Sequence, residues 1–83
     1  MYLLEIKKKA KKEIKALAKK DQQRVLAALD VLSENPFAGK RLEGEYQGAW
    51  SLRVWPYRIL YAVHRDIVTV NVLRVGHRKD VYR

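Results

Sequence analysis

The chain has 83 residues, no cysteine and a formal net charge of +9 at pH 7. We expect one small domain over residues 1–83, with a marginal core, because a chain this short buries only part of its unfolded surface. The lack of cysteine excludes disulfides and cysteine-ligated metal sites. The excess of lysine and arginine predicts a polyanionic partner such as nucleic acid.

The N-terminus does not have the order of a signal peptide. Its lysines, at positions 7–9, follow a very short apolar piece instead of preceding a long one. The sequence also has no apolar run long enough to span a bilayer. We therefore expect a cytoplasmic protein that does not work in a membrane.

The chain begins with a predicted strand and a predicted helix. Residues 2–6 are mostly apolar and fit a strand that joins a later sheet. Between Lys7 and Lys20 the apolar residues recur at the spacing of one helical stripe, and lysines fill the other face, which we interpret as solvated. The stripe consists of Ala10, Ile14, Leu17 and Ala18.

A second helix is predicted from Asp21 to Asn35. Asp21 is a suitable N-cap, and Pro36 ends the helix because the residue before proline avoids helical geometry. The short connection between the two helices predicts an antiparallel hairpin. The apolar stripe of the second helix consists of Val25, Leu26, Leu29 and Leu32.

The second half of the chain predicts a loop, over residues 37–47, and then a three-stranded meander. Trp55-Pro56 marks a tight turn between the first two strands. The fold class is therefore α+β, with a mainly antiparallel four-stranded sheet and the helical hairpin on one face. The predicted order is strand, helix, helix and three strands, the last three at residues 49–54, 57–64 and 67–75.

Arginines inside the predicted strands indicate a site for an anion, since a charged side chain in a strand is costly unless it faces water or a counter-ion. Alternation places Ser51 and Arg53 on the face away from the helices, and Arg58 follows the turn. Arginine binds phosphate with a planar fork but is a poor proton carrier, so proton transfer would fall to an imidazole or a phenol. The candidate catalytic residues are Arg53, Arg58, His77, Arg78 and Tyr82.

Structural interpretations compete with these functional ones. Arg53 can simply cover apolar surface with its stem, and Arg74 fits a structural role. The aromatic residues of the strands are most simply packing residues, although they could stack on bases. No group of side chains has the spacing of a metal site, and we expect no cofactor. Further candidates, for RNA contacts, are Lys40, Arg41, Ser51, Arg74 and Lys79.

Several segments of the chain match one known family. They are Asn35-Pro36, Leu42–Gly44, Trp50–Val54, Tyr57–Tyr61 and Arg74–Tyr82, of which the last two are the most specific. Together with the helix pair, they resemble the RelE/ParE superfamily of bacterial and archaeal toxins, small basic partners in toxin–antitoxin pairs. The resemblance covers the whole chain and implies a four-stranded, mainly antiparallel sheet with two helices on one face.

The resemblance also implies roles for single residues. Arg53 matches a basic strand residue of the RelE site, and Arg58 matches its strand arginine. Arg78 matches the arginine after Val-Gly-x, and Tyr82 matches the tyrosine of the tail. His77 occupies a position that is often basic.

Position 51 departs from the pattern of the family. Ser51 stands where some members carry a second lysine that has been proposed to serve in proton transfer. The departure shifts the expected proton transfer to His77 and Tyr82.

RelE-type members cut messenger RNA in the ribosomal decoding site, and the resemblance implies a metal-independent endoribonuclease of that kind. The ribose 2′-oxygen would attack the adjacent 3′-phosphate and leave a 2′,3′-cyclic phosphate and a 5′-hydroxyl. The expected partners are messenger RNA in the A site of the 30S ribosomal subunit and an acidic antitoxin protein. Two alternatives remain: a non-nucleolytic toxin that binds DNA gyrase, as ParE-type members do, and a basic RNA-binding module without catalysis.

Overall fold

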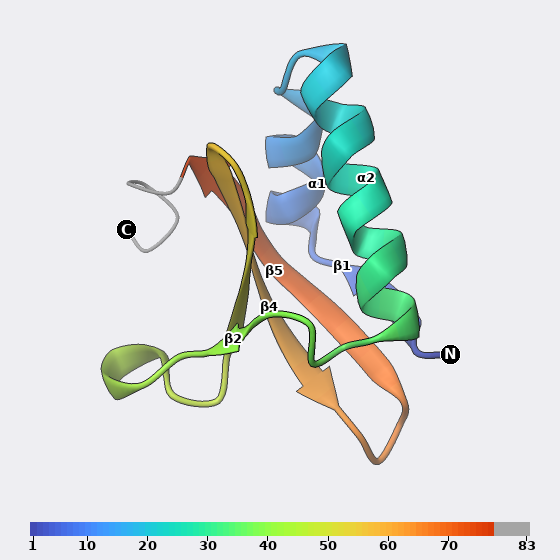
Figure 1. The fold of residues 1–83 in the computed structure, drawn as a ribbon, viewed down its shortest axis with the longest axis vertical. Helices are drawn as coiled ribbons and strands as arrows, with labels where there is room; N and C mark the ends of the chain where they lie inside the picture. The colour runs from blue at the N-terminus through green and yellow to red at the C-terminus, as the bar shows by residue number, and fades with distance from the viewer. Residues whose placement is uncertain (78–83) are drawn as a thin grey trace.

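The computed structural model describes residues 1–77, which form two helices and five strands (Figure 1). Three predicted site residues, Arg78, Lys79 and Tyr82, lie outside the described residues. In chain order the elements are β1 (Leu3–Ile6), α1 (Lys8–Lys15), α2 (Lys19–Glu34), β2 (Lys40–Arg41), a 3-10 turn (Gly44–Tyr46), β3 (Trp50–Val54), β4 (Tyr57–His64) and β5 (Thr69–His77).

The strands of residues 1–77 form one mixed sheet in the order β1-β5-β4-β3-β2. β1 is parallel to β5, and the other neighbours are antiparallel. The predicted α+β class and mainly antiparallel sheet are confirmed, but the sheet has five strands instead of four. The additional strand is β2, in which Lys40 and Arg41 pair with Ser51 and Trp50. Two residues are too few to show an alternating pattern, so the sequence predicted a loop there.

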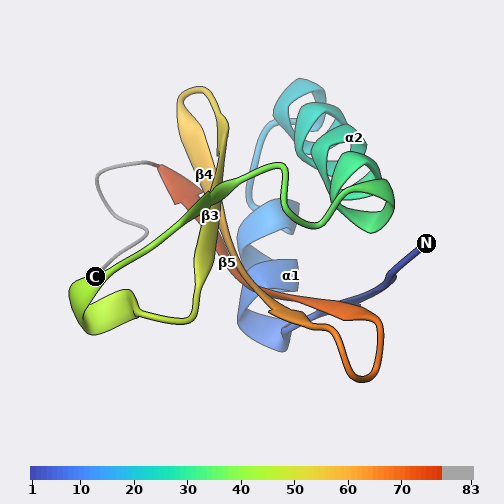
Figure 2. The same ribbon diagram turned by 60° about the horizontal axis from the view of Figure 1, so that its bottom comes forward.

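The two helices cover one face of the sheet and form the predicted hairpin (Figures 1 and 2). Leu26 was predicted to join the apolar stripe of the second helix, but its side chain is 48% exposed. The other three predicted residues of that stripe are buried. The core consists of Ala10 and Ile14 of α1, Val25, Leu29 and Leu32 of α2, and Ile59, Tyr61, Val70, Val72 and Val75 of the sheet.

The connection between the helices differs from the prediction. The first helix ends at Lys15 instead of Lys20, and α2 begins at Lys19 with Ala18 as its N-cap residue. Asp21 is therefore not the N-cap. It lies in the first turn of α2, where the positive end of the helix dipole still favours a carboxylate.

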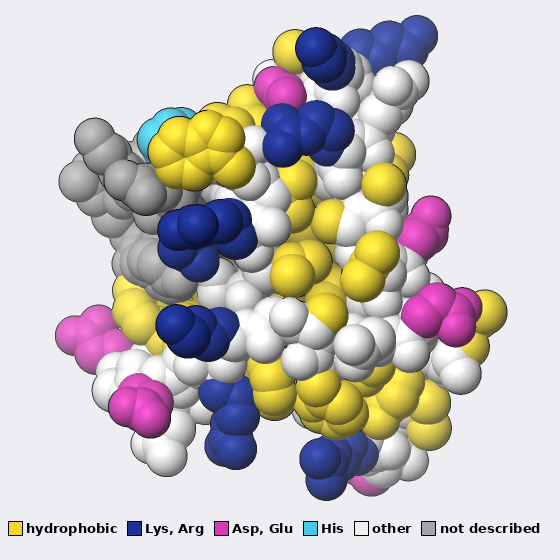
Figure 3. All heavy atoms as spheres, viewed as in Figure 1, with side chains coloured by type: hydrophobic (Ala, Val, Ile, Leu, Met, Phe, Trp, Pro, Cys, Tyr) yellow, Lys and Arg dark blue, Asp and Glu magenta, His cyan; other side chains and the backbone are white. Residues whose placement is uncertain are grey.

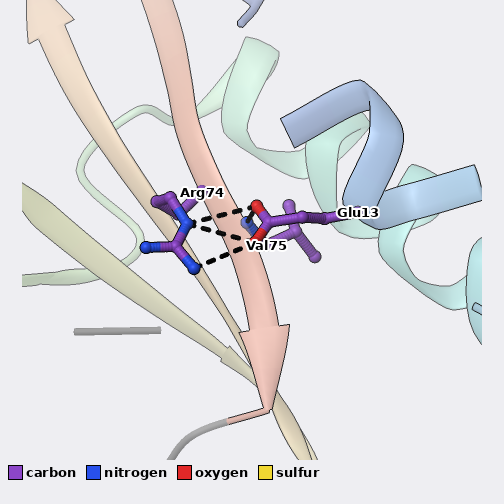
Figure 4. Close-up of polar contacts among 3 residues, drawn as sticks. All are labelled: Glu13, Arg74 and Val75. Atoms are coloured by element: carbon purple, nitrogen blue, oxygen red, sulfur yellow. Dashed lines mark hydrogen bonds and ion pairs between the residues drawn. The ribbon is translucent and has the colours of Figure 1, made fainter. Parts of the chain in front are cut away.

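On the side of β1, the end of β5 is bound by α1 instead of by a strand (Figure 4). β5 begins two residues later than predicted and ends at His77, whereas its pairing with β1 ends at Val72. Beyond that point the Glu13 carboxylate accepts a hydrogen bond from the backbone N–H of Val75 at 3.0 Å. It also accepts bonds from Nε and Nη2 of Arg74 at 3.0–3.3 Å. One carboxylate thus neutralises the arginine and occupies the open edge of the strand.

Candidate functional site

Arg53 and Arg58 lie directly opposite each other on the face of the sheet that the helices leave open. The antiparallel register of β3 and β4 pairs these two residues. Trp50 and Leu52 of the same strand pack toward the core, so alternation points both arginines the other way. Like charges in opposite positions destabilise a sheet, and an anion bound between them would remove that repulsion.

A shallow pocket of about 500 Å³ lies beside the two arginines. Three of its lining residues are cationic, namely Lys40, Arg53 and Arg58, and none is acidic. The ion pairs within residues 1–77 involve Arg24 and Arg74 and not these three cations. The remaining lining residues are Ala38, Gly39, Ser51 and Leu52. The pocket therefore has the charge and the donors that a phosphate group requires.

Ser51 lines the pocket. It is only 3% exposed, and its Oγ accepts a long hydrogen bond, of 3.4 Å, from Nη1 of Arg58. A bond of this length is weak. It orients the guanidinium without satisfying it, so Arg58 keeps donors for an external anion.

Tyr61 holds the loop that forms one wall of the pocket. Its hydroxyl donates to the carbonyl oxygen of Pro36 at 2.9 Å and accepts from the N–H of Gly39 at 3.0 Å. Burial raises the pKa of the Tyr61 phenol, and the bond from Gly39 opposes this effect. A Cβ at position 39 would lie 2.5 Å from the Tyr61 hydroxyl and 2.6 Å from the carbonyl oxygen of Ser51, so only glycine fits.

A second network fixes the hairpin of β3 and β4 to α2. The Tyr57 phenol donates to the Asp21 carboxylate at 2.9 Å. Arg24 donates to the carbonyl oxygen of Trp55 at 2.7 Å and forms an ion pair with Asp21 at 3.6 Å. The hydrogen bond to Asp21 is the main reason why the pKa of Tyr57 is raised. The first turns of α2 therefore position the turn that joins the two arginine-bearing strands.

His77 lies on the other face of the sheet, which contradicts the predicted constellation. The register of β4 and β5 pairs it with Tyr57, and the two rings lie 6.4 Å apart at 83°. Gly76, not His77, is the residue opposite Arg58. The structure therefore does not bring the imidazole together with Arg53 and Arg58.

A β-bulge explains this placement. Val70 and Val72 face the core, so strict alternation would point His77 to the open face. The register shifts between Leu60 and Tyr61, and beyond the shift the next core residue of β5 is Val75. The shift reverses the faces of all later residues of the strand, His77 included.

Two predicted RNA contacts lie outside the pocket. Alternation in β2 puts Lys40 on the pocket side, and it puts Arg41, which pairs with Trp50, on the helix side. Arg74 forms the ion pair with Glu13, as the structural interpretation suggested. Lys40 lines the pocket, and its contact with RNA stays a prediction.

Gly39 and Tyr61 shape the site, but the sequence did not predict them as site residues. A glycine in a loop has many explanations, and a tyrosine at a core position of a strand predicts packing alone. Only the long-range contact between the two residues shows that each requires the other.

Another hollow, of about 590 Å³, lies at the outer strand β1. It is lined by Glu5 as well as by Lys7 and Lys11, so its charges are mixed and it suits a phosphate less well. Within residues 1–77, no three His, Asp or Glu side chains are grouped as a metal site requires. Neither helix of this part of the chain has the length and apolar character needed to cross a membrane.

Comparison with known proteins gives a family match over nearly the whole chain. Residues 4–82 match the family model described as ParE toxin of type II toxin-antitoxin system, parDE. The chain is 41% identical, over 66 residues, to Toxin RelG of Mycobacterium tuberculosis (strain ATCC 25618 / H37Rv). This alignment covers 72% of the chain and 76% of that protein.

Solved structures agree with the sequence match. A chain in the RelBE2 toxin–antitoxin complex from Mycobacterium tuberculosis superposes with a TM-score of 0.76 and 34% identity, covering 93% of this chain and 98% of that one. A chain in the archaeal RelE–RelB complex from Pyrococcus horikoshii OT3 gives a TM-score of 0.82 and 25% identity, covering 95% and 97%.

Proposed function

The chain belongs to the ParE/RelE family of toxins of type II toxin–antitoxin systems, and we propose that it is an endoribonuclease that cleaves messenger RNA in the ribosomal A site. The observation that carries the proposal is the cationic pocket on the open face of the sheet. Lys40, Arg53 and Arg58 line it without an acidic residue. A purely structural surface has no need to place two arginines opposite each other, because the arrangement costs stability.

In the proposed reaction one bond to phosphorus forms and another bond to the same phosphorus atom breaks. The ribose 2′-oxygen bonds to the phosphorus of its own 3′-phosphate as it loses its proton, and the bond from phosphorus to the 5′-oxygen breaks as that oxygen gains a proton. Arg58 would hold the phosphate and the negative charge that develops on its oxygens, with Arg53 and Lys40 beside it. The products are a 2′,3′-cyclic phosphate and a 5′-hydroxyl.

Two further residues enter the proposal from the sequence and the family resemblance, since they lie outside the described residues. Arg78 would be a second phosphate ligand and Tyr82 the group that moves a proton. His77 is a weaker candidate than the sequence indicated, because its ring lies beside Tyr57 on the other face.

The test is a translation reaction with purified ribosomes and the full chain, read by primer extension on the messenger. We expect cleavage within the codon in the A site, only when ribosomes are present, and a 2′,3′-cyclic phosphate on the upstream fragment. Tyr82→Phe should slow cleavage and leave ribosome binding almost unchanged, since only the hydroxyl is lost. Ribosome binding without any cleavage by the parent protein would contradict the nuclease and leave a basic RNA-binding module.

A second candidate function follows from the ParE description of the family model. In this alternative the chain binds DNA gyrase and cuts no RNA. Supercoiling by purified gyrase in the presence of the chain separates the two functions. Inhibition of gyrase together with intact messenger would favour this alternative.

We also propose an acidic antitoxin as the partner of the chain. The relatives with solved structures form toxin–antitoxin complexes, and the open face of this chain carries cations that an acidic segment can neutralise. Such a segment would fold on binding and block the donors that RNA needs. Co-purification with the product of the neighbouring reading frame, followed by a salt series, tests this: salt should weaken the electrostatic part and spare the apolar part.

A further inference from the structure

A further pocket, of about 310 Å³, is lined by residues of β3, of β4 and the turn after it, and of the chain between α2 and β3. These segments meet near the lower end of the molecule in Figure 1. Figure 3, drawn from the same side, shows hydrophobic side chains gathered at that end, with Lys and Arg side chains beside and below them. The volume is at the small end of the range of roughly 300–1,000 Å³ that is typical of ligand sites. The lining residues are Phe37, Arg41, Gly48, Trp50, Val63 and Arg65.

The floor of this pocket is a supported aromatic platform. The rings of Phe37 and Trp50 lie 5.4 Å apart at 57°. The indole of Trp50 is also stacked on the ring of Tyr61, at 6.3 Å and 25°, and Tyr61 is fully buried and hydrogen-bonded. Phe37 is 40% exposed, so the platform is accessible from solvent.

Each accessible ring carries a guanidinium. The Cζ atom of Arg65 lies 5.1 Å from the ring centroid of Phe37, and that of Arg41 lies 6.0 Å from the ring centroid of Trp50. The ion pairs within the described chain involve Arg24 and Arg74 instead. A guanidinium on a ring keeps its N–H groups and its other face free for a planar ligand with negative charge.

The short strand β2 connects this pocket with the cationic pocket of Lys40, Arg53 and Arg58. Lys40 points to the open face and lines the cationic pocket, whereas Arg41 points to the helix side and lines the aromatic one. The two pockets therefore lie on opposite sides of one edge strand. A flexible polyanion that passes around this edge can occupy both.

We propose that the pocket between Phe37 and Trp50 binds one unpaired nucleotide of the RNA whose phosphate lies on the open face. The base stacks on the guanidinium plane of Arg65, which the Phe37 ring supports, and the adjacent phosphate accepts hydrogen bonds from the N–H groups of Arg41 and Arg65. Flat aromatic rings together with planar cations favour a nucleotide over an acidic peptide, whose carboxylates would use the charges but not the rings. The proposal rests on the RNA-directed function given above.

The test measures binding of the full chain to a short single-stranded RNA in which every ribose is 2′-O-methylated, so that no cleavage occurs. Phe37→Leu keeps an apolar side chain but removes the ring, and Arg65→Lys keeps the charge but removes the plane. Each should weaken binding roughly fivefold to a hundredfold, the range of one stacked base. Lys15→Gln, a charge change on the exposed face of α1, is the control and should lower the affinity and the salt dependence slightly.

An abasic scan of the RNA identifies the bound base. Removing the base at one particular position of the RNA should weaken binding to the parent chain by a similar factor. The same removal should not weaken binding to the Phe37→Leu variant any further, because that variant has already lost the stacking contact. Circular dichroism and the melting temperature should show that the variants are folded.

Two outcomes would contradict the proposed nucleotide binding in this pocket and leave the proposed nuclease activity untouched. Equal RNA affinity of the parent, Phe37→Leu and Arg65→Lys would exclude a stacked nucleotide. Loss of antitoxin binding with unchanged RNA binding would assign the pocket to the protein partner. Conversely, weaker RNA binding by Phe37→Leu and Arg65→Lys, together with no cleavage of messenger by the parent chain on ribosomes, would support the nucleotide pocket and contradict the proposed nuclease activity.

Discussion

Arg74 and Arg58 lie on neighbouring strands of one sheet, but their guanidiniums have different surroundings. Arg74 donates to both oxygens of the Glu13 carboxylate, within the chain. Arg58 lies opposite Arg53, and its Nη1 donates a hydrogen bond of 3.4 Å to the hydroxyl of Ser51. The first arginine ties a helix to a strand, whereas the second keeps most of its donors for something outside the described chain.

The same contrast holds between the two faces of the sheet. On the helix side the phenols of Tyr57 and Tyr61 each have a hydrogen-bond partner within the chain. On the open side the cations of the pocket repel one another and form none of the described ion pairs. Changes on the helix side should therefore lower stability, and changes on the open side should lower activity.

The largest expected effect is the loss of cleavage in Arg58→Ala. Removing a donor that holds a developing negative charge should slow messenger cleavage by about 10²–10³-fold. The melting temperature should stay the same or rise slightly, because the repulsion with Arg53 is gone. Single-turnover cleavage and thermal unfolding measure the two effects, with Lys15→Ala as a control for net charge. Parent-like cleavage would remove Arg58 from the site.

Gly39→Ala should have the largest effect on stability. The new Cβ would meet the Tyr61 hydroxyl and the carbonyl oxygen of Ser51 at 2.5–2.6 Å, so the loop or the strand must move. The expected cost is about 1–3 kcal/mol, measured by urea unfolding. Ala38→Ser, at the exposed neighbouring position, is the control and should change little. If Gly39→Ala unfolded at the same urea concentration as the parent, the loop around Gly39 would be less rigid than these contacts indicate.

Glu13→Gln should lower stability by about 1 kcal/mol. The amide retains an acceptor for the N–H of Val75 but loses the charge that pairs with Arg74. A double-mutant cycle with Arg74→Gln isolates the coupling of the pair. The Arg74→Gln variant should also cleave messenger at nearly the parent rate. A strong loss of cleavage would instead support the prediction that Arg74 contacts RNA.

The smallest expected effect is on the stability of the protein at alkaline pH. The pKa values of Tyr57 and Tyr61 are raised, so the folded chain holds these protons more tightly than the unfolded chain, in which tyrosine titrates near ~10. This contribution is complete below that pH and is lost as the pH rises through the folded pKa values. The free energy of unfolding should therefore fall above about pH 10. In Tyr57→Phe the free energy of unfolding, measured by urea unfolding at each pH, should fall less steeply with pH. An unchanged slope of this free energy against pH would contradict the assigned hydrogen bond from Tyr57 to Asp21.

The sequence by itself determined the order of the two helices and the four longer strands, most of the apolar stripe of the second helix and the side of the sheet on which Arg53 lies. Alternation along one strand is a local property, and the turn at Trp55-Pro56 fixes the register across the hairpin to Arg58. These are short-range features, which is why the sequence could predict that Arg53 and Arg58 lie near each other on the face away from the helices.

Only the tertiary structure decided the position of His77 and the partner of Arg74. The register shift beside Tyr61 reverses the faces of the last part of β5, and no local pattern in the sequence specifies an extra residue in a strand. Glu13 meets Arg74 only because α1 lies where β1 no longer pairs with β5. Both depend on contacts between residues far apart in the chain, which local periodicity cannot encode.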